Sequence, residues 1–84
     1  MTDRFKHIVE REVSRINEEI GSEAVAIDFI PISKTKMNIA RVWMKDFPTS
    51  IPGNVINKIA KMCETYWMLY RVRQGNEFLY IEID

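Results

Sequence analysis

The fold is decided by the stretch from residue 68 to residue 83, MLYRVRQGNEFLYIEI. Two runs rich in β-branched and aromatic residues flank Gly75-Asn76, and this dipeptide at the centre of a two-residue turn is typical of a β-hairpin. Counting outward from the turn, Gln74 faces Glu77. The pairs predicted beyond it are Arg73/Phe78, Val72/Leu79, Arg71/Tyr80, Tyr70/Ile81, Leu69/Glu82 and Met68/Ile83.

The predicted hairpin has two unlike faces, because side chains directly opposite each other share one side of a sheet. One face is apolar and consists of Val72/Leu79, Tyr70/Ile81 and Met68/Ile83. The other face mixes charged and aromatic side chains and consists of Arg73/Phe78, Arg71/Tyr80 and Leu69/Glu82. A three-residue loop with a bulge would shift the pairs by one residue and mix the two sets. With the two-residue turn, we expect the apolar face to line a core and the mixed face to form a surface.

The remainder of the chain places two helices and two further strands before this hairpin. Apolar residues recur at intervals of three and four over residues 3–20 and 52–65, which predicts amphipathic helices. A period of two predicts strands. With the hairpin included, the expected strands cover residues 24–30, 37–45, 67–73 and 77–83.

The element order predicts an α+β fold in a single domain over residues 1–84. It consists of two consecutive α-β-β units that form one four-stranded antiparallel sheet with both helices on one face, because each helix has a single apolar stripe to bury. The core is expected to contain Val25, Ile27, Phe29, Ala40, Val42, Met44, Met68, Tyr70, Val72, Leu79, Ile81 and Ile83.

Composition limits the function classes. The chain has 84 residues, 46% of them hydrophobic, with 12 basic and 12 acidic side chains. Disorder of the whole chain is excluded, because a disordered chain combines low hydrophobicity with high net charge. No apolar run is long enough to span a membrane, and the first residues do not resemble a signal peptide. With Cys63 as the single cysteine, no intrachain disulfide is expected. The sequence therefore predicts a cytoplasmic protein without membrane contact.

The charges are distributed unevenly along the chain. Residues 1–23 carry four basic and six acidic side chains, whereas residues 24–48 carry four basic and two acidic ones. The basic segment includes Lys34 and Lys36. A molecule with an acidic helical side and a basic, aromatic strand surface is expected to attract its own copy as readily as a phosphate backbone. The zero net charge of the whole chain favours a protein partner.

The side of the sheet that faces away from both helices, called the open face below, is the candidate functional surface. The residues predicted to bind a partner there are Arg41, Trp43, Lys45, Arg71, Arg73, Phe78 and Tyr80. We expect a non-enzymatic binding module that acts through this face, by self-association as a homo-oligomer or by docking on a partner protein. One alternative is binding of single-stranded nucleic acid by stacking and phosphate contacts on the same residues, which the zero net charge disfavours. Another is an ordinary solvated face on which arginines pack over Tyr80.

No motif for catalysis, for a cofactor or for a metal ion is found. His7 lacks clustered partners and is expected on a helix surface. Cys63 falls on an apolar helix stripe and is expected to be a small buried residue. Asp28 is expected to pair with an arginine on the open face; an enzymatic role would need Asp28 and Glu82 to converge in a concave site. The sequence predicts no catalytic residue, and a small enzyme is the third alternative.

Overall fold

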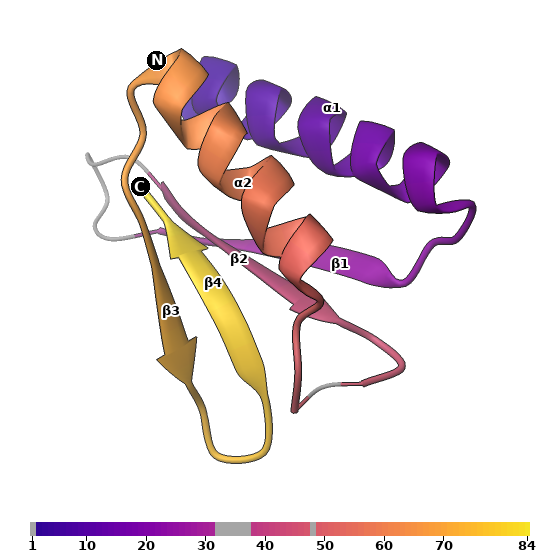
Figure 1. Cartoon of the computed structure of the whole chain (residues 1–84). Helices are drawn as coiled ribbons and strands as arrows, with labels where there is room; N and C mark the ends of the chain where they lie inside the picture. The colour runs from indigo at the N-terminus through magenta and orange to yellow at the C-terminus, as the bar shows by residue number, and fades with distance from the viewer. Residues whose placement is uncertain (1, 32–37, 48) are drawn as a thin grey trace.

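Two helices and a four-stranded antiparallel sheet are present in a computed structural model, which describes residues 2–31, 38–47 and 49–84 (Figure 1). The predicted α+β fold is confirmed, and the elements follow one another in the predicted order. Their bounds are α1 Thr2–Ile20, β1 Val25–Pro31, β2 Asn38–Met44, α2 Gly53–Tyr66, β3 Tyr70–Gln74 and β4 Leu79–Ile83. Lys34 and Lys36 of the basic segment lie outside the described residues.

The strands lie side by side in the order β1-β2-β4-β3, and every neighbouring pair is antiparallel. The last strand of the chain is thus central, and β3 forms an edge of the sheet. Figure 1 shows α1 and α2 on the same side of the sheet, running in opposite directions. The other side, the open face, is covered by neither helix.

The core lies between the helices and the sheet. It follows from the helical spacing of three and four residues and the strand period of two. Residues spaced by three and four on the helices meet alternate residues of β1, β2 and β4. The buried cluster is Phe5, Val9, Val13, Ile16, Val25, Ala40, Val42, Met44, Val55, Ile59, Met62, Cys63, Ile81 and Ile83. Burying a Val, Ile or Met side chain stabilises a fold by roughly 1.5–3 kcal/mol, so these contacts supply the main stabilising contribution.

The register of the hairpin differs by two residues from the prediction. Arg71 pairs with Glu82 and Val72 with Ile81, and the N–H of Gly75 donates to the carbonyl of Phe78 at 2.7 Å. Gly75 therefore precedes the turn instead of forming its centre. A Cβ atom on Gly75 would lie 2.9 Å from the ring of Phe78, so the glycine is needed for the close approach of that ring. Because the shift is an even number, the predicted pairs were wrong but each side chain keeps its predicted face.

Two of the predicted core residues are exposed. Tyr70 and Val72 of β3 have exposed fractions of 41% and 47%, although they point to the same side of the sheet as the buried Ile81 and Ile83. The helical residues of the core meet β1, β2 and β4, and none of the buried core residues lies on β3. The apolar side of β3 therefore extends past the covered part of the sheet.

The two edges of the sheet differ in how well their backbone groups are protected from pairing with another strand. At the edge formed by β1, the side chain of Asn17 on α1 accepts a hydrogen bond from the N–H of Val25 and donates one to its carbonyl. The strand ends at Pro31, which has no N–H to donate. Both devices hinder the pairing of another strand with β1. All five residues of β3, at the opposite edge, are exposed.

Helix α2 ends at a tryptophan with left-handed backbone. Trp67 has φ 60° and ψ 42°, and its N–H and that of Met68 both point to the carbonyl of Cys63. This reversal of the chain moves the start of β3 to Tyr70, so the prediction that a strand begins at residue 67 was wrong. A bulky residue with positive φ is uncommon, because its Cβ approaches the following carbonyl.

Candidate functional site

The open face brings three aromatic side chains and one arginine into contact. The rings of Trp43 and Phe78 meet edge to face with centroids 6.3 Å apart, and those of Phe78 and Tyr80 lie 5.3 Å apart at 31°. The guanidinium of Arg41 lies over Tyr80, 5.6 Å from the ring centroid. All four residues are partly buried. We call them the aromatic cluster, and all four were predicted to be site residues.

Arg41 is held by a carboxylate on the neighbouring strand. Its Nε donates to Asp28 Oδ1 at 2.9 Å and its Nη2 to Oδ2 at 2.6 Å. This fork-like geometry follows from the register that places Asp28 opposite Arg41 in β1 and β2. The hydrogen bonds with Asp28 raise the pKa of Arg41. The expectation that Asp28 pairs with an arginine is confirmed.

The two arginines of β3 share one glutamate of β4. Arg71 and Arg73 each contact Glu82 at 3.2 Å, and Arg71 lies 3.8 Å from Asp84. The side chain of Glu82 is only 14% exposed, because it lies between the two guanidinium groups. Both arginines are therefore on the predicted face, beside the aromatic cluster, and their charge is balanced within the chain.

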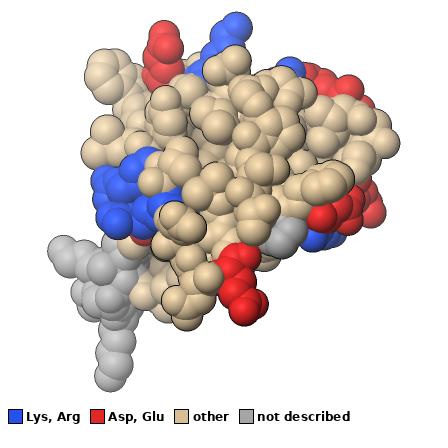
Figure 2. Space-filling view, turned by 60° about the horizontal axis from the view of Figure 1, so that its bottom comes forward, with Lys and Arg blue, Asp and Glu red and all other residues tan. Residues whose placement is uncertain are grey.

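Lys45 is the predicted site residue with the weakest connection to the rest. It lies one residue beyond β2, is exposed, and its N–H donates to the carbonyl of Ala24. Among the described residues it has no ion-pair partner. Figure 2 views the molecule from its lower side as drawn in Figure 1; uncharged residues fill the middle of this view and most charged side chains lie toward its rim.

Asp28 and Glu82 do not converge in a cavity. In the strand register, Asp28 of β1 and Glu82 of β4 both lie opposite Arg41 of β2. Strand β2 therefore separates the two carboxylates. His7 is exposed on α1. Cys63 is buried, and this burial raises its pKa to about 11, so at neutral pH the thiol is protonated and a poor nucleophile. Among the residues the structure describes, no group of three or more His, Cys, Asp or Glu is arranged to hold a metal ion.

A second group of exposed residues was not predicted to be functional. Trp67 is 96% exposed and Leu69 is 66% exposed, and both immediately precede β3 with its exposed Tyr70 and Val72. The predicted hairpin already placed Leu69 on the mixed face, whereas the exposure of Trp67 follows only from the structure, which sets it between α2 and the uncovered edge strand. The one signal in the sequence is a run of large apolar residues where a helix stripe ends.

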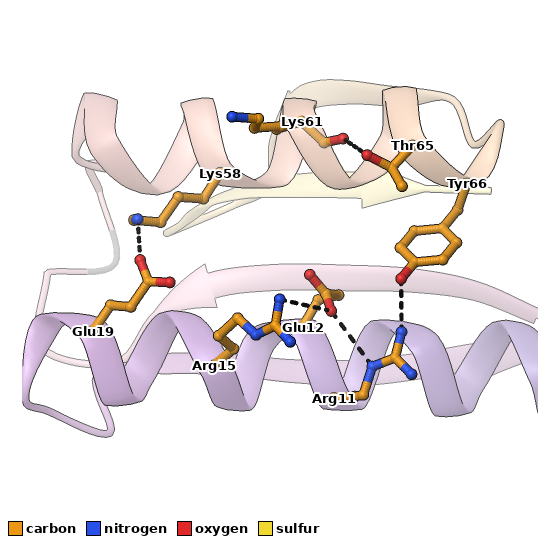
Figure 3. Close-up of polar contacts among 8 residues, drawn as sticks. All are labelled: Arg11, Glu12, Arg15, Glu19, Lys58, Lys61, Thr65 and Tyr66. Atoms are coloured by element: carbon orange, nitrogen blue, oxygen red, sulfur yellow. Dashed lines mark hydrogen bonds and ion pairs between the residues drawn. The ribbon is translucent and has the colours of Figure 1, made fainter.

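A groove between α1 and α2 is lined by paired charges (Figure 3). Arg11 donates to the hydroxyl of Tyr66 at 2.7 Å, and Lys58 pairs with Glu19, which lowers the pKa of that carboxyl. On α1, Arg15 lies 3.9 Å from Glu12. The Arg11–Tyr66 and Lys58–Glu19 contacts each join α1 to α2, so the polar side chains of this groove hold the two helices together.

Comparisons of the chain with protein families, with curated proteins and with solved structures give no match. Within the described residues, neither helix combines the length and the apolar character needed to cross a membrane.

Proposed function

We propose that the protein is a non-enzymatic binding module whose open face docks on protein, in the first instance on a second copy of itself. The observation that carries this proposal is that carboxylates of the same chain balance the charges of the arginines on this face. Arg41, Arg71 and Arg73 are balanced by the carboxylates of Asp28, Glu82 and Asp84, while the aromatic rings beside them are only partly buried. An aromatic centre with a polar, charge-balanced rim is the composition of protein interfaces.

A second copy suits this face, because the face carries both signs of charge beside one apolar centre. Two such faces related by a two-fold axis bring the aromatic centres together and place each ion-paired rim near the other. A short chain has a thin core of its own, so burial of the exposed parts of Trp43 and Phe78 adds to its stability.

The alternative is single-stranded nucleic acid bound by the same residues. Three neighbouring rings on an uncovered sheet favour it, because bases stack on such surfaces. Phosphates would have to compete with Asp28 and Glu82 for the arginines, and of the four basic residues predicted on the open face only Lys45 has no carboxylate partner among the described residues. Protein therefore remains the first choice.

Light scattering over a range of protein concentrations tests the proposal. We expect a dimer that Trp43→Glu converts to a monomer, while Trp67→Glu, the same change at the tryptophan outside the open face, leaves the mass unchanged. A wild-type chain that stays monomeric up to millimolar concentration overturns self-association. The same measurement with mixed oligonucleotides tests the alternative: binding that Arg71→Ala with Arg73→Ala weakens, and that depends less on salt in this variant, favours nucleic acid.

A further inference from the structure

The edge strand β3 presents unpaired backbone groups to solvent. Leu69 and Asp84 exchange two hydrogen bonds, and the N–H of Gly75 bonds to Phe78. Hydrogen-bonded and non-bonded pairs alternate along an antiparallel ladder, so Arg71 and Arg73 continue the bonded set. The N–H and C=O groups of Tyr70, Val72 and Gln74 consequently point away from β4. No strand in the described part of the chain pairs with them.

The opposite edge, formed by β1, is blocked at both of its ends. Asn17 occupies the backbone of Val25, and Pro31 ends β1 without a donor. Protected edges are the usual state of a sheet, because an exposed row of donors and acceptors pairs readily with another chain. The sheet therefore protects one edge at two positions and leaves the other able to add a strand.

Apolar side chains surround the open edge. Tyr70 and Val72 are exposed on the helix side of the sheet, and Leu69 precedes them. Trp67 is almost fully exposed in a left-handed backbone conformation. A costly backbone conformation at a residue that makes so little contact with the fold itself points to a role outside the fold. These side chains border the position that an added strand would take.

The charges of β3 argue against a second copy as the added strand. In an antiparallel pair of two β3 strands, the outward-facing residues Tyr70, Val72 and Gln74 must face one another. Arg71 and Arg73 then lie opposite arginines of the other copy, and like charges directly opposite are destabilising. Arg71 and Arg73 share the single carboxylate of Glu82, and Arg73 contacts it through Nε. A carboxylate of an added strand can therefore bind the terminal nitrogens of Arg73 without displacing Glu82.

We infer that β3 is a site of β-augmentation for an extended peptide segment of another protein, in which acidic and apolar residues alternate. Its backbone pairs with Tyr70, Val72 and Gln74. Its acidic side chains lie on the open-face side, beside Arg71 and Arg73. Its apolar side chains lie on the helix side, against Tyr70 and Val72, and a terminal apolar residue contacts Trp67. This mode of recognition combines main-chain bonds for affinity with alternate side chains for specificity. It uses the edge of the sheet and does not depend on self-association through the open face.

The probe is an eight-residue peptide of alternating glutamate and valine, titrated into the full chain and followed by NMR and amide hydrogen exchange. We expect the amides of Tyr70, Val72 and Gln74 to become protected. A peptide with lysine in place of glutamate is expected to bind more weakly, by about tenfold or by a larger factor, because each acidic residue lost removes a charge-assisted contact. Glutamate peptides that are N-methylated on the backbone facing β3 should not bind.

Variants of the chain separate charge from backbone. Arg73→Glu should reverse the preference between the glutamate and lysine peptides, and Arg15→Glu, the same change on α1, should not. Val72→Pro removes an outward N–H without removing a bond to β4, and edge strands tolerate proline; binding should be lost. If Val72→Pro does not fold, the N-methylated peptide gives the same information.

Three outcomes overturn the inference. The first is that no peptide binds at millimolar concentration. The second is equal binding of the glutamate and lysine peptides. The third is protection of the same three amides by increasing protein concentration alone, which would make a second copy the occupant. Because Trp43→Glu leaves this edge intact, loss of self-association in that variant with retained peptide binding distinguishes this inference from the proposed function.

Discussion

The side-chain amide of Asn17 forms two hydrogen bonds with the backbone of Val25, one in each direction and both at 3.0 Å. A helix residue thereby takes the place of a neighbouring strand at the first position of β1. The same contact connects the C-terminal half of α1 to the sheet, next to the turn at Gly21 and Ser22. It stabilises the packing of the helix and also blocks the first position of this edge of the sheet.

Asn17→Ala is expected to reduce the free energy of unfolding by about 1–3 kcal/mol, because it leaves a partly buried N–H and a partly buried carbonyl without partners. Urea denaturation measures the change, and the amide of Val25 should exchange its hydrogen faster. Ser14→Ala, an exposed change on the same helix, is the control. If the two variants are equally stable, the bonds to Val25 contribute nothing to the stability of the fold.

The ion pair of Asp28 and Arg41 gives a second prediction. Asp28→Asn should lower the free energy of unfolding by about 1 kcal/mol, which is less than for a buried charged pair, because both side chains are partly exposed and screened by water. The loss should shrink in high salt. Asp46→Asn, at an exposed position beyond β2, serves as the control, and a loss that is independent of salt would argue against an electrostatic origin.

The hairpin shows which features of the fold can be predicted from the sequence alone. The face of each side chain follows from alternation, so Tyr80 and Arg71 were placed on the open face although their predicted pairing was wrong. The strand order does not follow, because it depends on which pairing of distant segments buries most apolar surface. For that reason Tyr70 and Val72 were assigned to the core, while the strand order places them at an edge that the helices do not reach.

The site was predictable in composition and not in its connections. Alternation placed Arg41 and Trp43 on one side of β2 and Phe78 and Tyr80 on one side of β4. The contacts between these two groups required that β4 pair with β2, which no local pattern contains. The exposure of Trp67 was unpredictable for another reason: propensity places a large aromatic in a helix or strand, and only the capping geometry shows it in a left-handed turn.

Trp67→Gly is expected to stabilise the protein by about 1 kcal/mol, because glycine adopts positive φ without the steric cost that a side chain carries there. The indole contributes little packing to offset this gain, since it is 96% exposed. Thermal and urea unfolding measure the effect. Trp67→Ala keeps a Cβ in the same conformation and should therefore be no more stable than the wild type. A destabilised glycine variant would mean that the indole packs on the fold in solution.

Cys63 makes stability depend on pH in the alkaline range. Burial, with a smaller effect of the charge of Asp84, raises the pKa of its thiol from an ordinary value of 9.0 to about 11. Between these values the unfolded chain releases the proton and the folded chain retains it, so the free energy of unfolding falls as pH rises. The contribution is fully present below pH 9, and its loss through pH 11 amounts to at most about 2–3 kcal/mol.

Cys63→Ala isolates this contribution, because the lysines and tyrosines that titrate in the same range are common to both proteins. Urea denaturation at intervals from pH 8 to pH 11 should show the wild type losing stability more steeply than the variant. Below pH 8 the two curves should run parallel, offset by the packing that the sulfur provides. Parallel curves over the whole range would show that the thiol ionises equally easily in the folded and unfolded chain, and would contradict its burial against α1 and the sheet.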